Sequence, residues 1–232
     1  MTWALNLEAT SDVTSGVEDV IVASASVRAL RGMAAGERAE LARDQLTARE
    51  YDRFAVLAPF TKRQHEWLAG RIAAKRAVAE LTGAVPREVE ILQDDPTSRP
   101  YVTIPGVHIG ISHSFDVALG AAAPHAIGVD IELVRPLPAE LIAYAFVANE
   151  LDPLGSDATA MVRLWTMKES FVKMLGLGIG AFDDLRLATY DGRRASWLTR
   201  GRVAAALGAR QARCWAALAS GYAIALTWSV MR

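Results

Sequence analysis

The chain has 232 residues, 52% of them hydrophobic and 22% charged, which is enough to bury a substantial core as one large domain or two small halves. Its formal net charge of −1 argues against a protein that binds nucleic acid through bulk positive charge. The single cysteine, Cys214, excludes an internal disulfide and a cysteine-rich zinc site. No secretory signal or apolar run long enough to span a bilayer is found, so we expect a cytoplasmic protein without a membrane partner.

The first half of the chain predicts one strand, two helices and then short strands. β-Branched residues favour a strand over 20–27, and apolar residues at helical spacing favour a surface helix over 36–57. A second helix is expected from Thr61, a good N-cap residue, to about Leu81. The short strands that follow are 89–92 and 107–111.

Basic residues lie along the second helix, where Arg71 and Lys75 are four positions apart and share one face with each other. Arg63 lies one turn from the helix start. Two interpretations remain open from the residues alone. The three side chains form a solvated basic stripe, or they bind the phosphates of a nucleotide.

The second half of the chain predicts more strands around one long helix. Two apolar runs, 115–123 and 127–133, resemble the arms of a hairpin that turns at Pro124. The elements expected after them are a helix over 139–145, a helix over 158–175, a strand over 185–190, and two closing strands, 214–219 and 222–229, joined at Ser220-Gly221.

Two carboxylates alternate with apolar residues in the sequence Gly-Val-Asp-Ile-Glu, 128 to 132. A period of two puts Asp130 and Glu132 on one face of a strand. They form either the solvent face of a half-buried strand or part of a magnesium site, because Mg²⁺ typically takes one or two carboxylates and completes its shell with water and substrate phosphate.

The helix over 158–175 has an apolar face and a charged one. Glu169 and Lys173 are four positions apart on the charged face, and Gly176 is a plausible stop. Taken by itself, this pair is an exposed ion pair that stabilises the helix by only a few tenths of a kcal/mol.

Together these segments resemble the 4′-phosphopantetheinyl transferase superfamily. Gly128 to Glu132, followed by Trp165 to Lys173 in the order W-x-x-K-E-S-x-x-K, looks like the paired signature of that family. Ile111-Ser112-His113-Ser114 matches its third motif, and the basic helix that contains Arg63 and Arg71 resembles its N-terminal helix. Length and arrangement resemble the larger, monomeric type that activates peptide and polyketide synthases.

The resemblance implies an α+β fold of two similar halves related by a pseudo-twofold axis, with the active site in the cleft between them. A faint internal repeat agrees, because Lys75 precedes Gly83 by the same interval that separates Lys168 from Gly176. We expect an N-terminal half, 1–125, on the nucleotide side of coenzyme A and a C-terminal half, 126–232, with the metal and the catalytic helix.

The implied reaction transfers the phosphopantetheine arm of coenzyme A to a serine of an acyl or peptidyl carrier protein and releases 3′,5′-ADP. The resemblance places Asp130, Glu132 and Glu169 around Mg²⁺ or Mn²⁺, with Glu169 also as the base and Lys173 near the leaving phosphate. Glu150 resembles a further acidic position near Lys173. The implied coenzyme A contacts are Arg63, Arg71, Lys75, Arg99, Ser112, His113, Lys168 and Lys173. Around Arg99 the sequence departs from the family, because Ser98-Arg99-Pro100 stands where the family usually has Gly-Lys-Pro.

Two other classes of protein stay open at this point. One is a silent family member that binds coenzyme A or a carrier without transfer. The other is an unrelated α/β binding protein that contains these motifs by coincidence. A silent member would bind coenzyme A and leave a carrier unmodified, whereas the unrelated protein would do neither.

Overall fold

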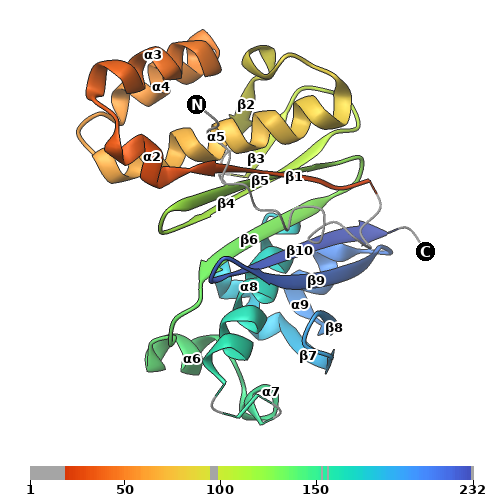
Figure 1. Ribbon diagram of the computed structural model, residues 1–232. Coiled ribbons are helices and arrows are strands. Elements are labelled where there is room, and N and C mark those ends of the chain that lie inside the picture. The colour runs from red at the N-terminus through yellow and green to blue at the C-terminus, as the bar shows by residue number, and fades with distance from the viewer. Residues whose placement is uncertain (1–18, 95–98, 153, 156, 231–232) are drawn as a thin grey trace. The chain divides into compact units, whose positions relative to one another are not determined.

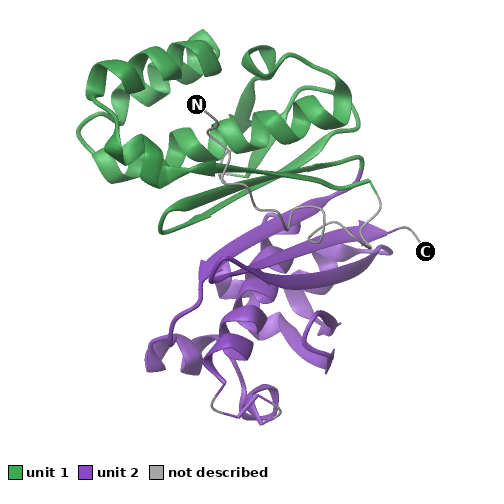
Figure 2. Cartoon of the chain, in the orientation of Figure 1, with its two compact units in different colours: residues 1–124 green, residues 125–232 purple. Residues whose placement is uncertain are grey.

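The computed structural model describes residues 19–94, 99–152, 154–155 and 157–230 (Figure 1). The chain divides into two compact units, residues 1–124 and 125–232 (Figure 2). Each unit contains a β-sheet with one long helix packed against it. The predicted class, α+β with two similar halves, is confirmed.

The first unit holds a three-stranded sheet in the order β1-β5-β4 and a separate β2-β3 pair. Its elements are β1 (Ile21–Ser26), α2 (Val27–Gly32), α3 (Ala35–Gln45), α4 (Ala48–Val56), α5 (Thr61–Thr82), η1 (Pro86–Glu88), β2 (Ile91–Gln93), β3 (Pro100–Val102), β4 (His108–Ser114) and β5 (Val117–Ala123). The long helix α5 packs on β1 and β5, and its buried residues Leu68, Ala69 and Ile72 form the centre of one core cluster.

The predicted helix over 36–57 is two helices. Leu46 and Thr47 have extended backbones, so α3 ends and α4 begins there. Thr47 and Glu50 form a capping box, in which the Glu50 carboxylate accepts a hydrogen bond from the Thr47 amide at 3.0 Å. The helix predicted from Thr61 is confirmed as α5 and ends before Gly83, whose φ is 76°. Thr61 is its first residue, however, and Phe60 holds the N-cap position.

The second unit holds a five-stranded sheet in the order β6-β10-β9-β8-β7. Its elements are β6 (Ile127–Leu133), α6 (Ala139–Ala145), α7 (Ala148–Leu151), α8 (Ala158–Met174), η2 (Ile179–Asp184), β7 (Leu185–Tyr190), β8 (Arg194–Thr199), α9 (Gly201–Leu207), β9 (Gln211–Ala219) and β10 (Tyr222–Val230). The predicted closing hairpin is confirmed as β9 and β10, with Ser220 and Gly221 in the left-handed region.

The hairpin predicted around Pro124 is wrong. β5 pairs with β1 and β4, whereas β6 pairs with β10 in the other sheet. In each unit the first strand therefore pairs with the last one, β1 with β5 and β6 with β10. The two apolar runs thus belong to different sheets, because each completes the sheet of its own unit.

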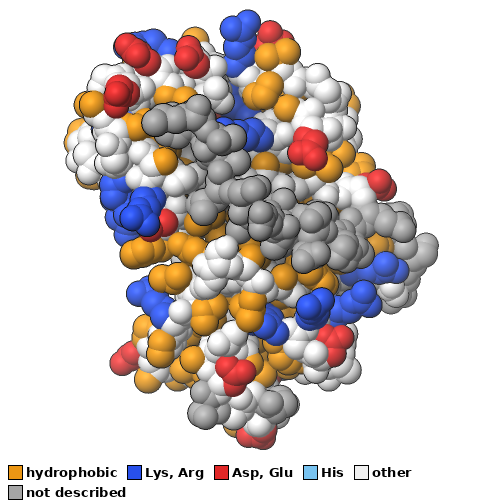
Figure 3. Space-filling model, in the orientation of Figure 1, with side chains coloured by type: hydrophobic (Ala, Val, Ile, Leu, Met, Phe, Trp, Pro, Cys, Tyr) orange, Lys and Arg blue, Asp and Glu red, His pale blue; other side chains and the backbone are white. Residues whose placement is uncertain are grey.

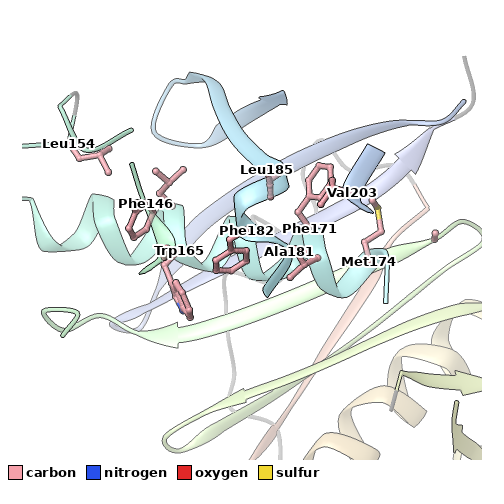
Figure 4. Packing of buried hydrophobic residues seen from close by; sticks show 13 residues of the cluster. Phe146, Leu154, Trp165, Phe171, Met174, Ala181, Phe182, Leu185 and Val203 are labelled. Atoms are coloured by element: carbon pink, nitrogen blue, oxygen red, sulfur yellow. The ribbon is translucent and has the colours of Figure 1, made fainter. Parts of the chain in front are cut away.

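The core of the second unit lies between α8 and the segment that follows it (Figure 4). Trp165 and Phe182 meet edge to face, with ring centroids 5.5 Å apart, an arrangement that aromatic pairs prefer. Phe171, Val172 and Met174 are buried on the same helix. These aromatic contacts pack α8 against η2, and Glu169 and Lys173 lie between the buried positions of α8.

The surface carries mixed charge. On the face shown in Figure 3, lysine and arginine side chains stand in several separate groups with acidic side chains among them. Among the described helices, none combines the length and the apolarity that crossing a lipid bilayer requires.

Gly128 is required by the close approach of β6 and α8. A Cβ added there would lie 2.5 Å from the amide nitrogen of Met174 and closer still to the carbonyl oxygen of Ser170. We expect Gly128→Ala to lower the free energy of unfolding by about 1–3 kcal/mol or more, because backbone atoms cannot move aside easily. Gly178→Ala is the matched control, since no atom lies within 4 Å of its added Cβ. Equal urea midpoints for the two variants would contradict this reading.

Candidate functional site

Strand β6 and helix α8 bring together the two acidic motifs. Asp130 lies in the middle of β6, opposite Ala225 of β10, and is only 2% exposed. Glu132 lies two residues further on the same strand and is half-buried. Glu169 comes from α8, which packs on β6. The structure therefore places the predicted carboxylates in one region of the second unit, although they are far apart in sequence.

The ammonium group of Lys173 lies among these carboxylates. Its Nζ atom is 2.5 Å from Oδ1 of Asp130 and 3.8 Å from Oε2 of Glu169. The Lys173 side chain as a whole is 37% exposed. The exposed i,i+4 pair that the sequence suggests is thus part of a larger charged cluster, because Asp130 joins it from the strand.

The protonation of Glu169 is poised near neutrality. Burial raises the pKa of Glu169 to about 7, and Asp130 and Glu132 act in the same direction while Lys173 opposes them. Burial alone would lower the pKa of Lys173, but Asp130 and Glu169 outweigh it, and the net direction is upward. A carboxylate with a pKa near 7 is suited to accept a proton at neutral pH.

The carboxylates of Asp130, Glu132 and Glu169 are the kind of ligands that bind a divalent cation. Carboxylate oxygens are ligands that Mg²⁺ prefers, and three carboxylates against one ammonium leave negative charge that a cation would balance. The described residues contain no group of three or more His, Cys, Asp or Glu side chains already arranged to hold a metal ion. In the geometry described here, the ammonium of Lys173 is the cation nearest to Asp130.

Lys168 is a structural residue, and its assignment as a coenzyme A contact is corrected. The side chain is 0% exposed, and its Nζ donates to the carbonyl of Ala145 and to Oε2 of Glu150, both at 2.7 Å. The ring of Phe146 lies 5.1 Å from the same nitrogen. Burial lowers the pKa of Lys168, and the Glu150 carboxylate opposes this shift.

Glu150 joins three elements of the second unit. Its Oε2 accepts from the Val147 amide at 3.1 Å as well as from Lys168, and its Oε1 accepts from the Leu187 amide at 2.7 Å. It thus ties α7, α8 and β7 together. We call this arrangement the Glu150 clasp. The resemblance placed Glu150 near Lys173, whereas the structure pairs it with Lys168.

Breaking the Glu150 clasp at one residue should destabilise the protein strongly. We expect Lys168→Met to lower the free energy of unfolding by about 3–5 kcal/mol, because it leaves a buried carboxylate without its partner. The double variant Glu150→Gln/Lys168→Met should recover most of this loss, since no buried charge then remains unpaired. Urea denaturation of the three proteins tests the expectation. A double variant as unstable as the single one would show that packing, and not charge, sets the effect.

Two cavities in the first unit gather several of the predicted coenzyme A contacts. They measure about 410 and 280 Å³ and share Trp67, Arg71 and Gln93 in their walls. Arg63 and His113 line the smaller one together with Arg71. The structure therefore brings together basic side chains from α5 and from β4, as a site for a phosphate-bearing ligand requires.

Three other predicted contacts have different surroundings. Lys75 is 0% exposed, and its Nζ lies 2.5 Å from Oε2 of Glu50, so it is a buried structural residue and its assignment as a coenzyme A contact is corrected. Ser112 is buried on β4 beside His113. Arg99 is half-buried, and its carbonyl accepts a hydrogen bond from the Asp94 amide at 2.9 Å. Its neighbour Pro100 lines the smaller cavity.

Comparison with known proteins gives the same family as the motifs. Residues 126–227 match the model of the 4′-phosphopantetheinyl transferase superfamily. The chain is 32% identical over 118 residues to 4′-phosphopantetheinyl transferase psf-1 of Bacillus pumilus, an alignment that covers 48% of this chain and 50% of that protein. It is 28% identical over 151 residues to a 4′-phosphopantetheinyl transferase of Bacillus subtilis, which covers 58% and 67% of the two chains.

A vertebrate relative aligns as well. The L-aminoadipate-semialdehyde dehydrogenase-phosphopantetheinyl transferase of Xenopus laevis is 28% identical over 142 residues, with 52% of this chain and 46% of that protein covered. The chain spans about half the length of the first two curated relatives it matches. The matched segment contains the acidic cluster of β6 and α8 and nearly the whole second unit. Residues 126–227 of this chain are therefore similar to the 4′-phosphopantetheinyl transferase superfamily.

Proposed function

We propose that this protein transfers the 4′-phosphopantetheine arm of coenzyme A to a serine hydroxyl of an acyl or peptidyl carrier protein and releases 3′,5′-ADP. The observation that carries the proposal is the cluster of Asp130, Glu169 and Lys173, which two separate motifs of the sequence build in the second unit. The relatives, which are named as transferases of this group, support it.

The residues of the cluster have distinct roles in the proposed reaction. The serine oxygen attacks the phosphorus atom that bears pantetheine, and the bond from that phosphorus to the oxygen of 3′,5′-ADP breaks. The carboxylate of Glu169 accepts the serine proton, and the ammonium of Lys173 balances the negative charge that grows on the leaving phosphate. We assign the nucleotide to the cavities of the first unit, where Arg63, Arg71 and His113 would hold its phosphates.

We further propose that Asp130, Glu132 and Glu169 hold Mg²⁺, with Mn²⁺ as an alternative. When bound, this ion neutralises the pyrophosphate of coenzyme A. The donor chemistry and the surplus of negative charge in the cluster support this assignment. The proposed working unit is a single chain, and the proposed location is the cytoplasm.

The proposal is tested by incubating the protein with coenzyme A, Mg²⁺ and a panel of apo carrier domains, and by recording the intact mass of each carrier. We expect a gain of one phosphopantetheine arm on at least one carrier, and no gain when the metal is chelated. Coenzyme A binding without modification of any carrier would favour a silent family member. Neither binding nor transfer would contradict the proposed function.

A further inference from the structure

The first unit contains its own buried clasp, built around Glu50. Oε2 of this carboxylate accepts from the Thr47 amide at 3.0 Å and lies 2.5 Å from the Nζ atom of Lys75. Oε1 accepts from the Ile91 amide at 3.3 Å. Glu50 thus ties α4, α5 and β2 together, and both it and Lys75 are buried. We call this arrangement the Glu50 clasp.

The Glu50 clasp repeats the main contacts of the Glu150 clasp. In both, a glutamate caps its own short helix, pairs with a lysine that is 0% exposed on the long helix, and accepts an amide of a following strand. Each lysine lies eight residues before the glycine that follows its helix, Gly83 or Gly176. In each unit the glutamate therefore joins a short helix, the long helix and a strand.

Arg71 adds a second cation beside Glu50, and among the described residues the Glu150 clasp has no equivalent of it. Arg71, one turn before Lys75 on α5, places its Nε atom 3.9 Å from Oε1 of Glu50, and its guanidinium lies over the ring of Trp67 at 4.9 Å from the centroid. The corresponding position in the second unit, one turn before Lys168, is Leu164. Glu50 therefore faces two cations, Arg71 and Lys75, whereas Glu150 pairs with Lys168.

The Arg71 side chain of the Glu50 clasp lies beside two cavities. Arg71 is only 5% exposed, lies in the wall of both cavities, and within the described residues its Nε has no hydrogen-bond partner. Because Lys75 lies closer to Glu50 than Arg71 does, the carboxylate charge is mainly taken up by the lysine. An anion in the smaller cavity, which Arg63 also lines, would supply a hydrogen-bonding partner of opposite charge for Arg71.

From this geometry we infer that Glu50 is a positioning residue for Arg71. It neutralises Lys75, which stays out of ligand binding, and it fixes the Arg71 guanidinium against Trp67 as the cation that meets an anionic group of the substrate. This inference rests on the proposed function, in which that substrate is coenzyme A.

The test removes the clasp without changing the net charge. In Glu50→Gln/Lys75→Met both buried charges disappear together, so the fold is retained and the long-range field at the cavities is nearly unchanged. We expect the KM for coenzyme A to rise about tenfold, the loss that one well-placed charge-assisted contact typically produces, with kcat within twofold of the original. Thermal unfolding establishes that the variant is folded, and Glu150→Gln/Lys168→Met is the matched control, whose KM for coenzyme A should stay within twofold.

A double-mutant cycle then shows whether Glu50 acts through Arg71. Arg71→Leu should raise the KM for coenzyme A about tenfold in the original protein and change it less than threefold in the Glu50→Gln/Lys75→Met background. Equal effects of Arg71→Leu in both backgrounds, or an unchanged KM in the folded Glu50→Gln/Lys75→Met variant, would overturn the inference alone. Failure of the original protein to bind coenzyme A would overturn the proposed function, and the inference with it.

Discussion

Glu169→Gln should lower the turnover number for phosphopantetheine transfer by roughly 10²–10⁴-fold, the usual contribution of a positioned base. Glutamine keeps the shape of the side chain but cannot accept the serine proton. The measurement is the initial rate of holo-carrier formation at saturating coenzyme A and Mg²⁺. Glu140→Gln, on the exposed first turn of α6, is the control and should leave the rate unchanged. A near-normal rate for Glu169→Gln would place the base elsewhere.

The same substitution should stabilise the metal-free protein at high pH. The pKa of Glu169 is raised in the folded state to about 7, above its ordinary value of 4.5, because burial disfavours the charged form. The contribution of Glu169 to the free energy of unfolding is therefore greatest below pH 4.5, and it is lost as the pH rises through 7. Glutamine does not ionise, so the variant should exceed the original protein by up to about 3 kcal/mol at pH 8, and this difference should shrink toward pH 4.5.

Urea denaturation at several pH values in a chelating buffer provides this comparison. Two proteins with the same pH dependence between 5 and 8 would contradict the raised pKa. If Glu169→Gln lowers the turnover number but raises the free energy of unfolding, Glu169 serves the reaction and destabilises the fold.

Asp130→Asn should lower transfer by roughly 10²–10³-fold at ordinary Mg²⁺ concentrations. The substitution removes one charged ligand from the proposed metal site and the closest partner of Lys173, while the size of the side chain is kept. Because Glu169 remains as a carboxylate partner of Lys173 at 3.8 Å, we expect the fold to remain intact. The rate is measured against Mg²⁺ concentration, and part of the loss should be recovered at high Mg²⁺.

The control for this variant is Asp183→Asn, which removes a carboxylate of the same unit that is exposed and pairs with Arg186. Its rate and Mg²⁺ dependence should match those of the original protein. An Asp130→Asn enzyme with lowered activity but an unaltered Mg²⁺ requirement would assign Asp130 to the orientation of Lys173 instead of to the metal.

Local patterns predicted most of the elements but few of the long-range contacts. The periodicity of α5 and α8 and the turn at Ser220-Gly221 reflect interactions within a few residues, so the sequence alone indicates them. The break between α3 and α4 was also readable, because Thr47-x-x-Glu50 is the pattern of a capping box. Strand partners are different, since β6 pairs with a strand about 90 residues away that no local rule identifies.

The acidic cluster was predictable because its residues lie in two recognisable motifs. The clasps were not, because long lysine side chains are expected at the surface and the glutamates that bury Lys75 and Lys168 lie about 20 residues away. Burial of this kind depends on three elements meeting at one carboxylate, which only the folded unit reveals.

The correspondence between the two clasps also aligns the rest of the two units. With Lys75 matched to Lys168, Glu169 corresponds to Arg76 and Lys173 to Glu80. Both units therefore contain a clasp, whereas the acidic cluster belongs to the second unit. The first unit has residues of opposite charge, Arg76 and Glu80, at the positions that match Glu169 and Lys173. Such asymmetry is what an ancestral duplication would leave after one copy specialised in the reaction and the other in holding an anion.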